Sequence, residues 1–167
     1  MTLVSTVQEK LSERPAFFAT LFGALTLLAA FISQYGFGLH PCEMCWWQRY
    51  PYMVAIALFL VFSLLKQQNS RSLLALLALT FAVNAGIAAF HVGVEEKWWE
   101  GITTCASSGI YTGSTEDILK AIQNAPLIRC DEIQFSLFGI SMAGYNFLIS
   151  LFLTVFCAIF ALRSRSL

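Results

Sequence analysis

Two cysteines separated by two residues, Cys42 and Cys45, lie in the segment HPCEMCWWQR, and Arg49 follows the second cysteine by four positions. A CxxC pair closes so small a ring that a disulfide within it restricts few chain conformations. Such pairs are more often redox-active or metal-binding than purely structural. Three kinds of chemistry are therefore open for this segment: a structural disulfide, a metal site and a redox centre.

The position of Cys45 favours the redox centre. Pro41 ends the preceding loop, and we predict that a helix begins near Cys42–Cys45. A thiol in the first helical turn lies at the positive end of the helix dipole, which favours the reactive thiolate. Arg49 projects from the same helical face as Cys45 and adds a permanent positive charge. The alternative for Arg49 is an anchor whose stem lies along apolar surface at a membrane interface.

Three further cysteines follow, Cys105, Cys130 and Cys157. A disulfide between Cys105 and Cys130 would close a loop of roughly 25 residues and stabilise the fold by about 3–4 kcal/mol in a chain-entropy model. Pairing cannot be deduced from sequence, although the distribution favours one bond within each of two loops. Cys157 falls inside an apolar run, where we expect an inert buried thiol.

The elements that must position these residues are long and apolar. Of 167 residues 57% are hydrophobic and 12% are charged, a charge content about half that of a typical soluble domain. Four uncharged runs are each long enough to cross a bilayer as a helix of roughly 17–25 residues. We predict helices over about 15–36, 45–65, 72–92 and 136–162. The expected fold is all-α, a four-transmembrane-helix bundle forming a single integral membrane domain over residues 1–167.

The basic residues indicate the orientation of this bundle. Six of them lie near helix ends on one side of the four-helix arrangement: Lys10, Arg14, Lys66, Arg71, Arg163 and Arg165. By the positive-inside rule this side, with both termini, is cytoplasmic. The loops at about 37–44 and 93–135 then face outward and hold the first four cysteines, on a side where disulfides persist. Within the longer loop, residues 114–126 carry a helix-start pattern and one apolar face, which predicts a short amphipathic helix.

These residues together resemble the disulfide bond formation protein B (DsbB) family of bacterial inner membranes. The resemblance covers nearly the whole chain: four helices, a CxxC that opens the second helix, an arginine four residues later and two cysteines in the second outward loop. The segment FHVGVEEKWW at the end of the third predicted helix is also similar to that of some members. Each feature is weak alone, but their combination is specific.

The resemblance implies a quinone-dependent thiol oxidase. A reduced periplasmic thioredoxin-fold oxidase of the DsbA type would attack a Cys105–Cys130 disulfide, with Cys105 forming the mixed disulfide. Cys130 would then exchange with Cys42, and Cys45 would pass electrons to ubiquinone or menaquinone while Arg49 stabilises its charge. A DsbA-type partner is itself strongly oxidising, at about −120 mV, so its reoxidation needs a stronger electron acceptor than glutathione.

His91, at the outward end of the third predicted helix, completes the candidate site. It lies near the depth of Cys45 and could hydrogen-bond a quinone carbonyl, because histidines in spanning segments are often functional. The alternative is an ordinary interfacial histidine. The tryptophans Trp46, Trp47, Trp98 and Trp99 are expected to form an aromatic belt.

Other functions stay open at this point. A thiol and quinone oxidoreductase similar to the vitamin K epoxide reductase family is one, although its active CxxC lies in a later helix. A metal-binding or small-solute transport protein with structural disulfides is another, and zinc would require further ligands such as His40, Cys105 or Cys130. We expect no metal, because the outward side is acidic and oxidising, and no nucleic-acid partner; the expected partners are the oxidase, the quinone and the lipid bilayer.

Overall fold

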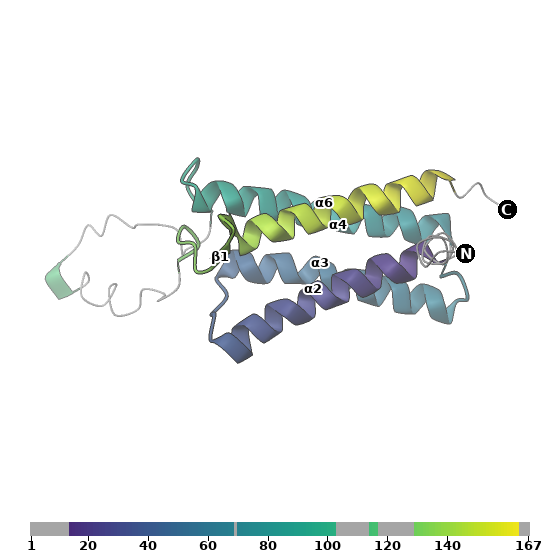
Figure 1. Cartoon of the computed structure of the whole chain (residues 1–167), viewed down its shortest axis with the longest axis horizontal. Helices are drawn as coiled ribbons and strands as arrows, with labels where there is room; N and C mark the ends of the chain where they lie inside the picture. Colours follow the sequence, from purple (N-terminus) through teal and green to yellow (C-terminus); the bar gives the residue numbers. More distant parts are fainter. Residues whose placement is uncertain (1–13, 69, 103–113, 117–128, 164–167) are drawn as a thin grey trace.

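A computed structural model of the chain describes residues 14–68, 70–102, 114–116 and 129–163. Its four long helices lie side by side along the longest axis of the molecule (Figure 1). They are α2 (Pro15–Phe37), α3 (Glu43–Leu64), α4 (Arg71–Glu95) and α6 (Met142–Arg163). The start of α2 and the end of α6 lie at one end of the bundle, and the end of α2, the start of α3, the end of α4 and the start of α6 lie at the other (Figure 1).

The composition of the helices supports a membrane protein. Three of them, α2, α4 and α6, are long and apolar enough to cross a membrane. The fourth, α3, has a comparable length of 22 residues, but its first two turns carry Glu43, Gln48 and Arg49. The prediction of four helices is therefore confirmed, while the composition expected of a membrane span is found in three of them.

Local sequence signals fix where the helices begin. Pro15 is the first residue of α2, a position where its missing N–H costs nothing. Cys42 is the N-cap of α3, and Ser70 caps α4 by accepting a hydrogen bond from the backbone N–H of Leu73 at 3.2 Å. At its other end α2 stops at Gly38, which adopts a left-handed conformation with φ 69°.

The prediction that the fourth helix begins at residue 136 is wrong. Residues 136–141 form a hairpin of two short antiparallel strands, β1 (Ser136–Leu137) and β2 (Ile140–Ser141), and α6 begins only at Met142. Phe138 and Gly139 connect the strands with φ of 51° and 80°. Two consecutive residues with positive φ cannot continue a right-handed helix, so the apolar run bends before it becomes helical.

The predicted amphipathic helix over 114–126 lies mostly outside the described residues. Thr115 and Glu116, at its start, are helical.

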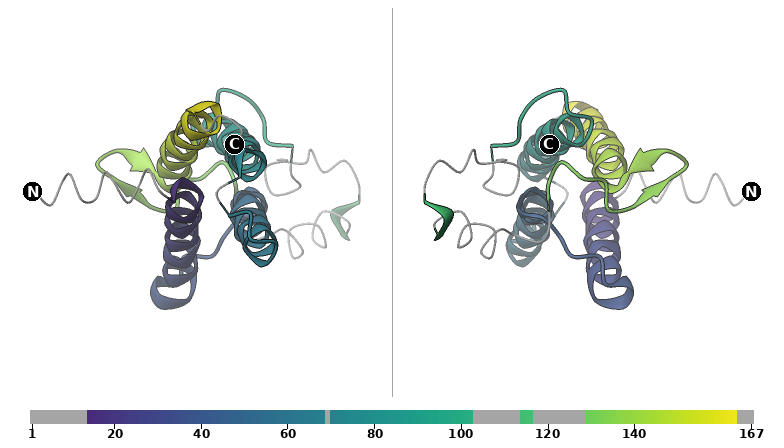
Figure 2. Two further views of the ribbon diagram at one scale, coloured as in Figure 1. Left: turned by 90° about the vertical axis from the view of Figure 1, so that its right-hand side faces the viewer. Right: turned by 90° about the vertical axis from the view of Figure 1, so that its left-hand side faces the viewer.

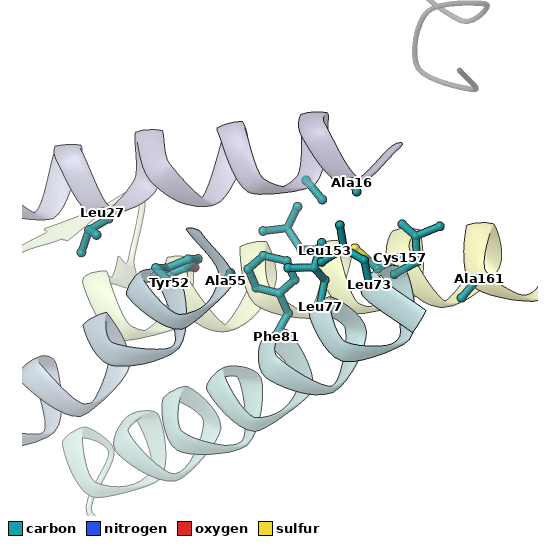
Figure 3. Close-up of a cluster of buried hydrophobic side chains, with 12 residues drawn as sticks. Ala16, Leu27, Tyr52, Ala55, Leu73, Leu77, Phe81, Leu153, Cys157 and Ala161 are labelled. Atoms are coloured by element: carbon teal, nitrogen blue, oxygen red, sulfur yellow. The ribbon is translucent and has the colours of Figure 1, made fainter. Parts of the chain in front are cut away.

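Two clusters of buried side chains lie at different depths in the bundle. The larger one, called here the apolar core, joins all four helices and includes Tyr52, Leu77, Phe81, Leu153 and Cys157 (Figure 3). The smaller one, called here the cysteine cluster, consists of Cys42, Met44, Val94 and Cys130. The cysteine cluster is at the end of the bundle where α3 begins and α4 ends, so it gathers residues from three separate parts of the chain.

Candidate thiol site

The paired cysteines lie at the start of α3, as predicted. The Cys42 sulfur accepts a hydrogen bond from the backbone N–H of Cys45 at 3.3 Å, which is the usual contact of a helix N-cap. The Cys42 thiol also donates a hydrogen bond to the Cys45 sulfur, with 3.0 Å between the two sulfurs. Because Cys45 lies in the first turn, its sulfur is near the positive end of the α3 dipole.

Cys130 reaches this pair from the other loop. It is fully buried in the cysteine cluster, and its side chain is a hydrogen-bond partner of Cys42. Contact with Cys130 lowers the pKa of Cys42, but the hydrogen bond to Cys45 and burial outweigh this effect and raise the pKa to about 12. Cys42 is therefore a protonated thiol at neutral pH, and it can stabilise negative charge on Cys45. Cys105 lies outside the described residues.

Charged neighbours hold the backbone at Cys130. Arg129 and Asp131, on either side of it, form a bidentate pair with N–O distances of 2.9 and 2.7 Å. The Arg129 guanidinium beside Asp131 lowers the pKa of that carboxyl. Arg129 is exposed and Asp131 partly exposed, whereas Cys130 between them is fully buried.

His91 from α4 also contacts the pair, and its neighbours define its tautomer. The side-chain amide of Gln48 donates a hydrogen bond to His91 Nδ1 at 2.6 Å. Since an amide nitrogen cannot accept, Nδ1 is the unprotonated nitrogen and Nε2 carries the proton. Nε2 lies 3.6 Å from the Cys42 sulfur and 3.9 Å from Glu95 Oε1. The His91 N–H therefore lies near the Cys42 sulfur and a buried carboxylate, and the ring is also hydrogen-bonded to the backbone of Cys130.

A chain of hydrogen bonds continues from His91 into the bundle. Gln48 Oε1 accepts from the Asn146 amide at 2.5 Å, and Asn146 Oδ1 accepts from the Tyr52 hydroxyl at 2.6 Å. Ser150 lies 3.0 Å from that hydroxyl. We call the set Gln48, Asn146, Tyr52 and Ser150 the polar chain. The sequence analysis did not select Gln48, although its spacing of three residues from Cys45 on a helix could have indicated it.

Arg49 is buried rather than exposed at an interface, with 6% of its surface accessible. Its guanidinium donates to Gln34 Oε1 at 2.5 Å and to the Ala30 carbonyl at 3.3 Å, both on α2. It also lies over the rings of Phe31 and Trp46, 4.9 and 4.7 Å from their centroids. All of these partners are neutral, and no carboxylate within the described residues forms an ion pair with Arg49. A buried cation of this kind is suited to a negatively charged or strongly polar neighbour.

A cavity of about 560 Å³ connects these groups. Cys45, Gln48, Arg49 and His91 are among its polar lining residues, and its wall is mostly apolar, with contributions from Leu27 and Ile149. Both its volume and its mixture of an apolar wall with a few polar groups are typical of small-molecule sites. The structure thus brings together five of the six predicted site residues, Cys42, Cys45, Arg49, His91 and Cys130, around or beside one cavity.

The same sulfurs could hold a metal ion. The ligand atoms of Cys42, Cys45 and His91 lie within 4.8 Å of one another. His91 was not among the metal ligands considered from the sequence. Structural zinc sites use four protein ligands. These three residues would therefore need one more to form a closed zinc site.

Comparisons with known proteins agree with this geometry. The family model described as "Disulfide bond formation protein DsbB" matches residues 12–160. The chain is 29% identical over 131 residues to a disulfide bond formation protein B of Xylella fastidiosa (strain 9a5c), a match that covers 75% of this chain and 76% of the relative. It is 27% identical over 144 residues to the uncharacterized protein RP370 of Rickettsia prowazekii (strain Madrid E), covering 85% and 83%. No solved structure matches the chain.

Proposed function

Because this chain belongs to the DsbB family of disulfide bond formation proteins, and is by that membership an oxidoreductase of disulfide formation, we propose that it oxidises a DsbA-type periplasmic thiol oxidase and reduces a membrane quinone. In bacteria such a pathway keeps the periplasm oxidising. The chain's own part in it is a relay of two cysteine pairs, with electrons entering at Cys105 and Cys130 and leaving from Cys42 and Cys45.

The observation that carries the proposal is the position of Cys42 between two sulfurs. It is a hydrogen-bond partner of Cys130 on one side and lies 3.0 Å from Cys45 on the other. Thiol–disulfide exchange needs a thiolate to approach a disulfide sulfur directly. When Cys42 and Cys45 are joined, attack by the Cys130 thiolate on Cys42 forms a Cys130–Cys42 bond and releases Cys45. The partner's second thiol then displaces Cys105 from the mixed disulfide, which leaves the partner oxidised. The freed Cys105 attacks Cys130, which restores the Cys105–Cys130 disulfide, releases Cys42 and leaves Cys42 and Cys45 as a dithiol.

The cavity next to Cys45 supports a quinone as the electron acceptor. A quinone head group is polar at its two carbonyls and apolar elsewhere, and the cavity offers Arg49 and His91 as donors within an apolar wall. When bound, the quinone accepts two electrons and two protons, the number that the Cys42–Cys45 dithiol releases as it becomes a disulfide. Arg49 stabilises the Cys45 thiolate, and its neutral partners on α2 leave its positive charge uncompensated.

His91 has a separate role in this proposal, that of a hydrogen-bond donor. Gln48 fixes its proton on Nε2, the nitrogen that faces the Cys42 sulfur. Held in this tautomer, His91 can donate to a developing negative charge at the cavity end of the site. Glu95, hydrogen-bonded to Ser141, lies 3.9 Å from Nε2 and holds a negative charge beside the same N–H.

We further propose that this end of the bundle faces the periplasm and that the protein lies in the bacterial inner membrane. The apolar helices and the family support a membrane location. The asymmetric distribution of lysine and arginine supports cytoplasmic termini. A periplasmic site would meet a soluble oxidase directly and a quinone through the bilayer.

Single replacements of the cysteines test the relay. Purified full-length protein would be mixed with a reduced DsbA-type oxidase and a soluble quinone, and both oxidation of the oxidase and reduction of the quinone would be followed. We expect Cys105→Ser and Cys130→Ser to stop oxidation of the partner. Cys42→Ser and Cys45→Ser should stop quinone reduction while still permitting a mixed disulfide with the partner. Quinone-coupled oxidation that survives the loss of Cys45 would refute the proposed order.

A further inference from the structure

The hairpin between the second outward loop and α6 projects sideways from the bundle. Seen along the helices, β1 and β2 extend away from α6 rather than continuing along the bundle axis (Figure 2). Ser136 pairs with Ser141 and Leu137 with Ile140. The Tyr145 hydroxyl, one turn into α6, donates a hydrogen bond to the Leu137 carbonyl at 3.0 Å, which attaches the hairpin to the helix.

Phe138, at the tip of the hairpin, has a left-handed backbone conformation that is unusual for phenylalanine. A two-residue turn with positive φ at both positions strongly favours Asn-Gly or Asp-Gly, yet here the first position is Phe138. A bulky side chain in the left-handed region is strained, and the ring of Phe138 gains little from the protein, since the residue is 91% exposed. A surface outlier of this kind indicates a function for the side chain beyond making the turn.

The hairpin around Phe138 carries exposed apolar residues, and so does a face of α6 that would contact lipid. Exposed apolar residues of the hairpin and its flanks are Phe135, Leu137, Ile140 and Met142. Farther along α6, Leu148, Leu151 and Phe152 are also exposed. Since α6 is one of the helices apolar enough to cross a membrane, this exposed face lies against acyl chains when it does so. The hairpin extends that face sideways at the level of the helix end.

We propose that the hairpin is an anchor whose tip, Phe138, inserts into the boundary between lipid headgroups and acyl chains. A structure that projects in the plane of the bilayer, at the end of a spanning helix, meets lipid before it meets a soluble protein. Phenylalanine, like tryptophan and leucine, is common on the apolar face of structures that lie at this depth. The occupant of this apolar surface is therefore phospholipid. This inference rests on the membrane location of α6 and not on the redox chemistry.

The anchor also has a consequence for the site. Phe135 and Leu137 line the cavity, and Cys130 lies on the same segment shortly before the hairpin. By holding this segment at a fixed depth, the hairpin places the side of the cavity nearest α6 next to lipid and holds Cys130 near Cys42.

Photo-crosslinking in phospholipid nanodiscs tests the anchor. The full-length protein would carry p-benzoylphenylalanine at position 138 or, as a control, at Glu132, whose exposed side chain is on the same segment. We expect phospholipid adducts to be at least about fivefold more abundant at 138 than at 132, by mass spectrometry. Equal lipid yields at the two positions, or crosslinks from 138 mainly to a second copy or to an added DsbA-type partner, would overturn the proposal.

A second experiment replaces the strained residue of the turn. Turn preference and anchoring predict opposite changes in the rate of amide hydrogen exchange in the hairpin. Phe138→Asn suits a left-handed position better than phenylalanine, so by turn preference alone it should slow amide hydrogen exchange in residues 136–141. If lipid holds the tip, the same substitution should accelerate exchange there about threefold or more in nanodiscs. Exchange that is unchanged or slower in Phe138→Asn would contradict the anchor.

Discussion

Cys157 and the cysteine cluster lie toward opposite ends of the bundle, and both contain buried thiols in different surroundings. Cys157 is fully buried in the apolar core, near Leu73 and Leu153 (Figure 3). Cys42 is 4% exposed, but it contacts two further sulfurs and a histidine. Burial by itself makes a thiol inert, because a thiolate is costly in apolar surroundings. The end that we propose to be reactive thus differs from the apolar core in the polar groups packed around its sulfurs.

The comparison extends to how each end is stabilised. At the apolar core the helices are held together by close packing of side chains. For example, Gly23 has no side chain, so α2 can lie close to the rings of Tyr52 and Phe81. At the site end, Arg49 is held by neutral hydrogen-bond partners and aromatic rings, and His91 by Gln48 with Glu95 nearby. Burying polar side chains within a membrane costs free energy, and polar residues found there are commonly functional. The four predictions that follow separate these two kinds of packing, beginning with the largest effect.

The largest effect is expected from exchanging one sulfur for oxygen at each end. Cys45→Ser should reduce quinone-coupled turnover at least about 1,000-fold, because a serine hydroxyl cannot form the disulfide that returns two electrons. Cys157→Ser is the matched control and should change turnover less than about twofold. The measurement is steady-state oxidation of a reduced DsbA-type partner with saturating quinone. A large loss in Cys157→Ser, with normal thermal stability, would mean that the apolar end also takes part in the chemistry.

Removing the buried cation should have the next largest effect. Arg49→Ala should lower kcat/KM for quinone about 100-fold, corresponding to about 2.7 kcal/mol, because the charge that favours the Cys45 thiolate is lost. Arg49→Lys keeps the charge but loses the planar group that binds both Gln34 and the Ala30 carbonyl, so it should recover only part of the rate. Affinity for the DsbA-type partner, measured by titration calorimetry, should stay within about twofold. An equal loss of partner affinity and quinone turnover would make Arg49 a structural residue.

At the apolar core the effect should be on stability alone. Leu77→Ala removes a fully buried side chain of α4, whereas Leu79→Ala removes one that is 62% exposed on the same helix. Lipid is as apolar as leucine, so the cost arises from lost packing, and we expect Leu77→Ala to lower the free energy of unfolding by about 2 kcal/mol. Leu79→Ala should change it by less than about 0.5 kcal/mol. Denaturation in detergent measures both, and turnover per folded molecule should stay constant.

The sequence predicted the contents of the site better than its arrangement. The CxxC pair, Arg49 and the depth of His91 follow from helical spacing and from the length of apolar runs, and the family resemblance is confirmed by the match over residues 12–160. The polar chain could not be predicted, because contacts such as Gln48 with Asn146 depend on how α3 and α6 are rotated against each other. The hairpin was not predicted, because phenylalanine is not a typical residue for a turn position with positive φ. Without a turn signal, the apolar run that contains Phe138 had the pattern of a helix.

The smallest effect should come from the polar chain, and it tests whether this chain positions His91 or only fills space. Asn146→Leu removes the donor to Gln48 Oε1, which frees the Gln48 amide to rotate away from His91 Nδ1. We expect a loss of about 10-fold in kcat for quinone reduction, about 1.4 kcal/mol, with a change of less than about twofold in KM. The shape of the pH–rate profile should also change, since the histidine would no longer be held in one tautomer.

Ser150→Ala is the matched control for Asn146→Leu. Ser150 contacts Tyr52 and Asn84 and donates a long hydrogen bond to Asn146 Oδ1 at 3.5 Å, but it has no hydrogen bond to Gln48. Ser150→Ala should lower the free energy of unfolding by about as much as Asn146→Leu does, because both variants lose a buried hydrogen bond. It should leave the pH–rate profile unchanged. If both variants lower kcat equally and neither changes the profile, the polar chain acts through packing, and the tautomer of His91 is set by its contacts with Cys42 and Glu95 instead.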